Sequence, residues 1–548
     1  MAENKPFLTI KNIFLLGVVI RLALMPIAAQ FGDCYNWYGF CFVFLNSPFE
    51  VYNTNNYFFP MTGNIYSYPP LWIYTMGFFM LPVFLLKIKS AAIVLFFIKL
   101  PLVLCSSYLA EILFRCTNSK KVLILFYLNP LVIFLDSVWG AFDILPATAV
   151  FLAYVFLRES KYSFSAFFLS IGILYKIWPV LILPLIVMSF IKEKKYKALI
   201  KYLGLILAVS LVLTSPYLLS PNRNFFFKEI FAHASRNINW QLSLWTPFLW
   251  LKEANLFDII RFNIGNISLP NLLFYAAFLI LYALAFKRKF NLTQQFLLPV
   301  LTFYIFSSWV TPSHYIWILP ILAILSAQNQ VLLLLYILLS FLPILSELCS
   351  TMTYRFTWGT FFSIPLFKSS WAGGILSIFA MIMITIWSYI YFYIIKTNKD
   401  LQFVGQNRVK ISLNQKIFVF VSIFFAFIVS NAYWGKISYY NPDNQLIDLF
   451  WEPHSNVKVY NELGIYYTHQ NRTKKARYLF NQAVQITPEY PVTYVNLAAF
   501  YAKSKNWPRA KYFITQAAVR DNSYFKLLDV IASKKPINFI TKVPHNYR

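Results

Sequence analysis

Apolar runs of 18 or more residues, the length that a helix needs to cross a lipid bilayer, recur along most of the chain. Hydrophobic residues make up 59% of the 548 residues, and the mean hydropathy is +0.57. No soluble core requires so much apolar sequence, so the runs predict a polytopic membrane bundle of the all-α class. About 12–14 helices are expected, among them 10–30, 68–86, 91–114, 122–157 as a broken pair, 163–190, 198–217, 269–286, 294–309, 312–327, 330–346, 370–395 and 416–433.

Clusters of lysine and arginine separate the apolar runs, and the net charge is +28. In membrane proteins such clusters mark cytoplasmic loops. The clusters are Lys87 with Lys89, Lys192–Lys201, Lys287–Lys289 and Lys396–Lys416. They predict that a first outer loop over 31–67, a middle outer loop over 218–269, the segment 347–369 and everything after Asn431 lie outside. No continuous basic stripe with interleaved aromatic residues is present, so nucleic acid is not expected as a partner.

Two further segments bear on the topology. Ile10–Gln30 is too long, and too poor in small residues near its end, for a cleaved signal peptide, so it is expected to be the first transmembrane helix. Arg115–Lys121 belongs in the cytoplasm by its charge, but a single crossing from Lys89 would place it outside. Re-entrant segments on either side of Asp136–Asp143 would restore the parity.

The chain has five cysteines, Cys34, Cys41, Cys105, Cys116 and Cys349, and their spacing is not that of metal ligands. No metal site is therefore expected. Cys34 and Cys41, seven residues apart in one loop, would form a disulfide if that loop faces an oxidising compartment.

The C-terminal region repeats with a period of 34 residues. The first copy carries Tyr460, Leu463, Gly464, Tyr467, Ala476, Phe480, Ala483 and Pro488, and the second carries Tyr494, Leu497, Ala498, Tyr501, Ala510, Ile514 and Ala517. This period and these residue types resemble the tetratricopeptide repeat, in which small residues let paired helices approach closely. We therefore expect a linker over 436–455, a short α-solenoid of two repeats over 456–535 with a capping helix near Asn522–Ser533, and a tail over 536–548.

Two interpretations of the expected solenoid stay open. It is either a docking or oligomerisation surface or a helical appendage on the last membrane helix. Its surface is rich in basic residues, which either attract an anionic partner or keep the domain soluble. These residues are Lys474, Lys475, Arg477, Lys503, Lys505, Arg509 and Lys511.

Charged residues at membrane depth are costly and therefore indicate function. Asp33 follows the first expected helix and is otherwise an ordinary interfacial residue. Asp136 and Asp143 are seven residues apart, which is one face of a continuous helix or, alternatively, a polar turn that breaks it. Lys176 lies in the middle of an apolar run, where its ammonium cannot reach water in either direction, so a charge partner, a cavity or an anionic ligand is expected.

The order of several motifs over roughly residues 10–395 resembles the integral membrane glycosyltransferases of the GT-C superfamily. The motifs are Asp33, Tyr68-Pro69-Pro70-Leu71, the Asn129–Asp143 segment with Trp139-Gly140, Lys176-x-x-Pro179, and Thr311-Pro312 followed by His314. The branches with the greatest similarity are the dolichyl-phosphate-glucose glucosyltransferases and the polyprenyl-phosphate-mannose mannosyltransferases. Two positions depart from the family pattern, since Ser67 stands in place of an aspartate and Ala141 in place of an amide.

The resemblance implies a hexosyltransferase in module 1–435 that moves mannose or glucose from a polyprenyl-phosphate carrier to an acceptor hydroxyl on the outer face, with inversion. Asp33 matches the catalytic base of the family by position. Candidates for binding the donor phosphate are Lys176, Arg236, His314 and Arg355, and supporting residues are Asp136, Asp143, Tyr68 and Trp139. With such cations no metal or other cofactor is required. We expect the paired prolines after Tyr68 to be scaffold that fixes the entry of the second helix.

The expected partners are the membrane, the lipid carrier, a glycan or protein acceptor and a protein bound by the repeats. The expected location is the plasma membrane of a prokaryote, with the repeats on the outer side of the cell envelope. A polysaccharide polymerase or ligase also joins many helices to such repeats, but its key arginines would lie in a large late outer loop. A lipid-linked sugar flippase or other transporter would favour inverted internal repeats. A scaffold carrying the repeats would not need Lys176 and Asp136 at depth.

Overall fold

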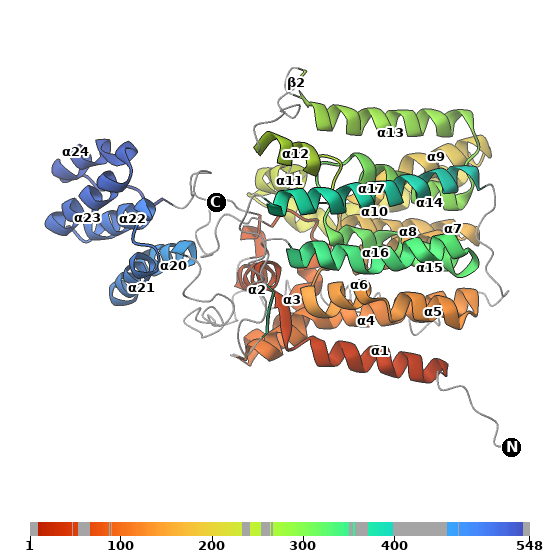
Figure 1. Ribbon diagram of the computed structural model, residues 1–548, viewed down its shortest axis with the longest axis horizontal. Helices are drawn as coiled ribbons and strands as arrows, with labels where there is room; N and C mark the ends of the chain where they lie inside the picture. The colour runs from red at the N-terminus through yellow and green to blue at the C-terminus, as the bar shows by residue number, and fades with distance from the viewer. Residues whose placement is uncertain are drawn as a thin grey trace. The chain divides into compact units, whose positions relative to one another are not determined.

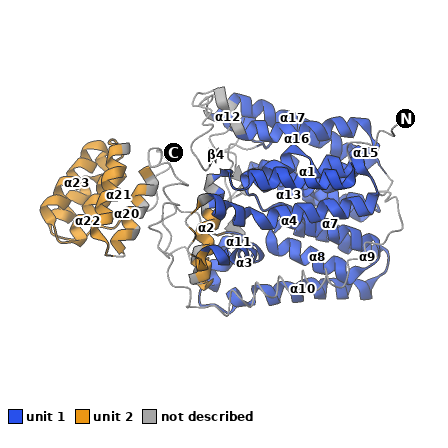
Figure 2. Cartoon of the chain, turned by 90° about the horizontal axis from the view of Figure 1, so that it is seen from below, with its two compact units in different colours: residues 1–34, 67–83, 92–433 blue, residues 35–66, 84–91, 434–548 orange. Residues whose placement is uncertain are grey.

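The computed structural model describes residues 9–46, 48–52, 66–86, 88, 90–232, 242–253, 263–264, 267–349, 354–356, 371–397, 457–469 and 471–540. The chain divides into two compact units (Figure 2). Unit 1 comprises 1–34, 67–83 and 92–433, and unit 2 comprises 35–66, 84–91 and 434–548. The expected helix over 416–433 and the expected linker over 436–455 lie outside the described residues.

From residue 10 to residue 396 the chain is almost entirely helical, and Figure 1 shows the long helices lying side by side. The elements are α1 (Ile10–Leu24), β1 (Ala28–Gln30), α2 (Phe31–Asn46), η1 (Pro48–Glu50), α3 (Leu71–Leu85), α4 (Ala91–Thr117), α5 (Lys120–Tyr127), α6 (Pro130–Ile133), the π-helix η2 (Phe134–Trp139), α7 (Ile144–Arg158), α8 (Tyr162–Tyr175), η3 (Trp178–Ile182), α9 (Leu183–Lys192), α10 (Tyr196–Leu218), α11 (Arg223–Ala232), α12 (Thr246–Glu253), β2 (Asn263–Ile264), β3 (Ile267–Ser268), α13 (Leu269–Lys287), α14 (Leu292–Phe306), η5 (Pro312–Trp317), α15 (Leu319–Gln328), α16 (Gln330–Cys349), β4 (Tyr354–Phe356) and α17 (Trp371–Lys396). The predicted predominance of helix is confirmed.

Five of these helices have the length and composition of membrane spans. They lie within α4, α10, α13, α16 and α17, and the bent pair formed by Lys120–Tyr127 and Pro130–Trp139 makes a sixth if it is one span. The other apolar helices of unit 1 have 10–17 residues. The apolar runs therefore do form helices suited to a membrane, but fewer than expected reach full span length in the described part of the chain.

Two predicted helices are interrupted in the structure, each at an identifiable break, and a third region is broken as predicted. The helix expected over 10–30 ends at Leu24, because Pro26 has no amide to continue it, and residues 28–30 form β1 instead. The helix expected over 163–190 is interrupted at Lys176, whose backbone is extended, three residues before Pro179. The pair expected over 122–157 is broken as predicted, at Gly140.

The basic loops of unit 1 meet at one end of its helices. Lys192 after α9 donates to the carbonyls of Ala285 and Arg288 after α13, and Lys289 forms an ion pair with Glu193 at 3.2 Å. The amide of Gln294 at the start of α14 bonds to the Ile394 carbonyl near the end of α17. Three clusters predicted to share one side of the membrane thus lie together; we call this the basic end.

The segment that did not fit the predicted orientation also lies at the basic end. Lys121 at the start of α5 donates to the carbonyl of Ala327 at the end of α15, at 3.0 Å. The neighbouring Asn329 bonds to the hydroxyl of Tyr393 in the last turns of α17. Arg115–Lys121 therefore lies at the same end as the other basic clusters, and α5 leads away from that end as the first half of a bent pair.

The C-terminal helices of unit 2 form an array of two helical pairs and a short cap. The pairs are α20 (Val457–His469) with α21 (Thr473–Ile486), and α22 (Pro491–Lys503) with α23 (Trp507–Arg520), followed by η7 (Asn522–Tyr524) and α24 (Lys526–Ala532). The small residues predicted to lie between paired helices, Ala476, Ala483, Ala498, Ala510 and Ala517, are all fully buried. A Cβ at Gly464 would lie 2.6 Å from the Phe480 ring, so only glycine fits there.

A cation over an aromatic ring recurs in the array with the period of the sequence. The Lys475 ammonium lies 4.5 Å from the centre of the Tyr467 ring, and 34 residues later the Arg509 guanidinium lies 5.4 Å from the Tyr501 ring. Each contact joins the two helices of one pair. The 34-residue period is therefore a structural period and not only a pattern of residue types.

Candidate functional site

Asp33 lies in the first turn of α2, whereas the sequence placed it in a loop. Its carboxylate Oδ2 accepts a hydrogen bond of 2.7 Å from the indole Nε1 of Trp139. Its backbone amide donates to Gln30 Oε1 at 2.6 Å. The side chain is half-buried. β1 ends at Gln30 and α2 begins at Phe31, and the bond from Trp139 places the carboxylate beside the end of the π-helix η2.

The segment Trp139–Asp143 is a break between two helices. η2 ends at Gly140, whose φ of 85° and ψ of 27° are left-handed. A Cβ at Gly140 would lie 2.9 Å from Cys34 Sγ, and that thiol bonds to the Trp139 carbonyl at 3.3 Å. The break therefore packs against the start of α2. Asp136 and Asp143 do not share one face of a continuous helix, so that interpretation is wrong and the alternative of a helix-breaking turn is correct.

The ammonium of Lys176 is paired with the carboxylate of Asp143, the last residue before α7. Lys176 Nζ lies 2.7 Å from Asp143 Oδ1, and the two side chains are 16% and 4% exposed. The indole of Trp317 donates to the same oxygen at 2.7 Å and stacks on Trp178 at 4.4 Å. The charge partner predicted for Lys176 is thus Asp143. Since Lys176 lies at the end of α8 and not within a helix, its side chain is free to turn toward α7.

Aromatic rings from the helix break and from the segment around Pro69 and Pro70 lie near this ion pair. Phe142 stacks on Trp72 at 4.7 Å and meets the edge of Tyr68 at 4.9 Å. The Lys176 ammonium lies 5.8 Å from the Tyr68 ring and 5.4 Å from the Phe142 ring. α3 begins at Leu71, directly after Pro69 and Pro70. The paired prolines thus set the start of α3, and Tyr68 just before them contacts the break at 139–143 through Phe142.

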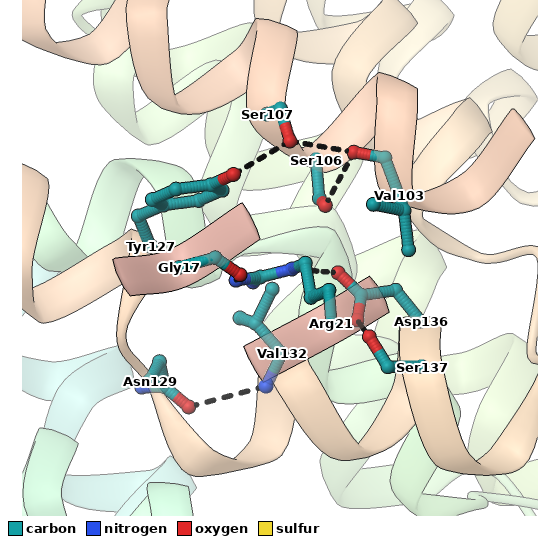
Figure 3. A network of polar contacts seen from close by, with 10 residues as sticks. All are labelled: Gly17, Arg21, Val103, Ser106, Ser107, Tyr127, Asn129, Val132, Asp136 and Ser137. Atoms are coloured by element: carbon teal, nitrogen blue, oxygen red, sulfur yellow. Dashed lines mark hydrogen bonds and ion pairs between the residues drawn. The ribbon is translucent and has the colours of Figure 1, made fainter. Parts of the chain in front are cut away.

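Asp136, another predicted supporting residue, forms a fully buried ion pair with Arg21 of α1 (Figure 3). Arg21 Nε donates to Asp136 Oδ2 at 2.8 Å, and Ser137 Oγ donates to Oδ1 at 2.5 Å. The guanidinium also lies 4.3 Å from the Tyr127 ring. Both side chains have zero exposure. The pair joins the end of α1 to the π-helix, so the contacts of Asp136 indicate a structural role.

Lys99 of α4 is a buried cation that the sequence reasoning missed. It has zero exposure, and its ammonium donates to the carbonyls of Met25, Ala28 and Ser137, the first and last at 3.1 and 2.9 Å. It therefore joins the end of α1, β1 and the π-helix. The signal was present, because Lys99 interrupts an apolar run just as Lys176 does. Arg21 gave the same signal in the first run.

The structure describes the side chain of one remaining phosphate-binding candidate and the backbone of another. His314 is buried in η5, its ring 4.5 Å from that of Trp317, and its Nδ1 accepts the Thr311 amide at 3.3 Å. Arg355 lies in β4, in antiparallel register with Ala29 of β1, so its backbone is near the start of α2. Arg236 lies outside the described residues. The structure thus brings Lys176 and His314 together around Trp317.

Cys34 and Cys41 are buried free thiols, so the disulfide that the sequence left open is not formed. The aromatic residues Trp37, Tyr38 and Trp245 are also buried, with 4%, 7% and 2% exposure, which makes them packing residues. Among the described residues, no group of three or more histidine, cysteine, aspartate or glutamate side chains has the arrangement of a metal site.

Comparison of the chain with models of protein families finds no match, and comparisons with curated proteins and with solved structures find none either. The geometry around residues 139–143 is therefore what bears on function. It holds a half-buried carboxylate, Asp33, on one side of a helix break and a nearly buried ammonium, Lys176, on the other.

Proposed function

We propose that the chain is an integral membrane glycosyltransferase of the GT-C type. In this proposal it transfers a hexose from a polyprenyl-phosphate carrier to an acceptor hydroxyl by an inverting displacement. One observation carries the proposal: Trp139, the last residue of η2, and Asp143, the last residue before α7, hold Asp33 and Lys176 respectively. A base and a cation held by one segment are what such a displacement needs.

Asp33 is proposed as the base. The acceptor oxygen attacks the anomeric carbon as its proton passes to the Asp33 carboxylate, and the bond from that carbon to the phosphate oxygen breaks. The lipid phosphate leaves with the electron pair of that bond. The hydrogen bond from Trp139 supports this role, because it fixes the orientation of the carboxylate.

Lys176 is proposed to offset the charge of the departing phosphate. Its ammonium is oriented by Asp143, and Trp317 shares that carboxylate oxygen, so the group is preorganised before the donor arrives. His314 is close enough to Trp317 to contribute a second donor. Arg236 and Arg355 stay candidates for the bidentate contact that a guanidinium offers to phosphate. Since cations balance the charge, the proposal requires no cofactor.

The rings around Lys176 are proposed to shape the sugar-binding region. Tyr68, Phe142 and Trp317 surround the ammonium within 6 Å of their ring centres. Aromatic faces bind the apolar face of a hexose and also exclude water from the charged groups. Both effects strengthen the electrostatic stabilisation that Lys176 supplies.

We also propose a multi-pass arrangement in a prokaryotic plasma membrane, with the basic end in the cytoplasm and the Asp33 region outside. The clustering of Lys121, Lys192 and Lys289 at one end supports this orientation. The C-terminal array is proposed to be two tetratricopeptide repeats on the outer side that dock a protein or the acceptor. Its 34-residue structural period supports that assignment.

The decisive experiment supplies purified protein with a panel of polyprenyl-phosphate sugars and with membrane extract as acceptor. Transfer of one radiolabelled hexose by the native chain, and its loss in Asp33→Asn, would support the proposal. Elongation of lipid-linked oligosaccharides without use of any monosaccharide donor would indicate a polymerase or ligase instead. Movement of lipid-linked sugar across proteoliposomes without transfer would indicate a flippase.

A further inference from the structure

The last described residues of the chain lie on the C-terminal array, bound there through their backbone. The amide of Ile540 donates to Asn496 Oδ1 at 2.7 Å, and Asn496 Nδ2 donates to the Ile540 carbonyl at 3.2 Å. One side-chain amide thus satisfies both backbone groups of one residue. This pairing depends on the main chain and not on the isoleucine side chain, so any residue but proline can make it.

Asn496 is held ready for this pairing by buried polar partners. It is fully buried in α22, and its Nδ2 also donates to Asn461 Oδ1 of α20 at 3.2 Å. Asn461 in turn donates to Thr493 Oγ1 at 2.7 Å and to the Val457 carbonyl at 2.9 Å. A buried amide group without hydrogen-bond partners is costly. The bond to Asn461 uses one Nδ2 hydrogen of Asn496, so its second Nδ2 hydrogen and its Oδ1 are left for the tail.

The residue before Ile540 supplies a second anchor. The ring of Phe539 lies 6.4 Å from the Phe480 ring in a stacked arrangement and 5.7 Å from the His469 ring at an angle of 64°. Phe480 is fully buried between α20 and α21. The aromatic contact and the amide contact together require an aromatic residue directly before the residue whose backbone is bonded.

We propose that Asn496, Asn461, Phe480 and His469 form a peptide-binding site, the tail site, for a non-helical segment of another polypeptide with such an aromatic residue. The chain's own residues 536–540 occupy the site until that segment displaces them. One backbone pairing and one ring contact are few anchors, and the tail is retained because it is tethered to α24. A partner that continues beyond these two residues would therefore compete successfully.

The test measures binding of a fluorescent peptide with the sequence KKPINFITK, residues 534–542, to the detergent-solubilised chain. A chain truncated after Ser533 lacks the internal competitor and should bind the peptide at least ten-fold more tightly than the full chain. N-methylation at the position of Ile540 removes the donor to Asn496, and alanine at the position of Phe539 removes the ring. Each should weaken binding at least ten-fold, whereas N-methylation at the position of Ile537 should not.

Protein variants complete the test. Asn496→Ala in the truncated chain should weaken binding, and the exposed Gln485→Ala should not. Because Asn496 is buried, its variant needs an unchanged helical circular dichroism signal to count; the N-methylated peptides test the same bond without altering the protein. No binding to the truncated chain, or equal losses with both N-methylated peptides, would overturn the proposal. Dimerisation of the full chain that disappears on Phe539→Ala would instead assign the tail site to a second copy.

Discussion

Lys176 and Trp317 donate to the same carboxylate oxygen of Asp143, each over 2.7 Å. The three residues come from the end of α8, from η5 and from the residue before α7. A single carboxylate therefore joins three helical segments at the break that also positions Asp33 through Trp139. The following predictions test this arrangement and the orientation of the chain.

Replacing the carboxylate of Asp33 should abolish most of the proposed transfer. Asp33→Asn keeps the size of the side chain and its acceptor for Trp139 but removes the base, so turnover should fall by about 100-fold or more. Trp139→Phe removes only the hydrogen bond that orients the carboxylate and should cost less. Steady-state kinetics with the hexose donor measures both. Normal turnover in Asp33→Asn would remove this residue from the mechanism.

Breaking the Arg21–Asp136 pair should destabilise the fold strongly. Both side chains have zero exposure, so Asp136→Asn leaves an uncompensated buried charge at a cost of about 3–5 kcal/mol. Arg115 and Glu111 form the matched control pair, 46% and 39% exposed, for which Glu111→Gln should cost less than about 1 kcal/mol. Denaturant titration in detergent micelles compares the two. Equal costs would mean that the Arg21–Asp136 pair is solvated.

Lys99→Met should reduce transfer without changing the affinity for the donor. The substitution leaves the carbonyls of Met25, Ala28 and Ser137 without their buried donor, so the segments that carry Asp33 and Trp139 lose their common anchor. We expect kcat to fall about ten-fold or more with little change in KM, as for loss of positioning. Lys121→Met, which removes an exposed bond to one carbonyl at the basic end, should leave both constants unchanged.

Cysteine labelling tests the orientation. The native Cys34 is buried and should not react. Two engineered sites are better suited: Leu219→Cys at the end of α10, a position that is 86% exposed, and Lys194→Cys in the exposed loop at the basic end. In a background without native cysteines, an impermeant thiol reagent should label Leu219→Cys on intact cells and Lys194→Cys only after lysis. The reverse pattern would invert the topology.

Stability should depend on acidic pH through Glu193 at the basic end. Lys195 donates to its carboxylate and Lys289 also pairs with it, which holds the pKa of Glu193 below its usual value. A carboxyl with a lowered pKa stabilises the fold above its unfolded pKa, about 4.3, and loses that contribution as the pH falls further. The native chain should therefore exceed Glu193→Gln in stability by up to about 1 kcal/mol at pH 7, and the difference should shrink as the pH falls through the lowered pKa of Glu193 in the folded state.

Much of the fold could be predicted because apolar length and charge act locally. The runs gave the helices, and the basic clusters gave the loops that meet through Lys192 and Lys289. The 34-residue pattern gave helical pairs with the expected small residues inside, such as Ala476 and Ala510. In each case the residues that determine the element are its own neighbours in sequence.

The candidate site was less predictable because its partners are distant in sequence. Asp33 and Trp139 are 106 positions apart, and Lys99 reaches carbonyls 38 to 74 positions away. Every residue has a backbone carbonyl, so the sequence cannot show which carbonyls accept hydrogen bonds from Lys99. Its role could therefore not be predicted from a partner residue. For the extended backbone at Lys176, which sets the direction of its side chain, the sequence signal was Pro179, three residues further on in the same apolar run.

The recurrence of one cation–ring contact at Lys475–Tyr467 and Arg509–Tyr501 bears on how the C-terminal array can change in length. Each helical pair has its own cation–ring contact and its own small residues. A duplicated block of 34 residues would therefore contain the contacts within its pair and the small residues that close helix packing requires. An insertion of any other length would rotate the added helices out of register. Growth by whole blocks is therefore open to this chain, and a lysine and an arginine at equivalent positions show that the block tolerates either cation.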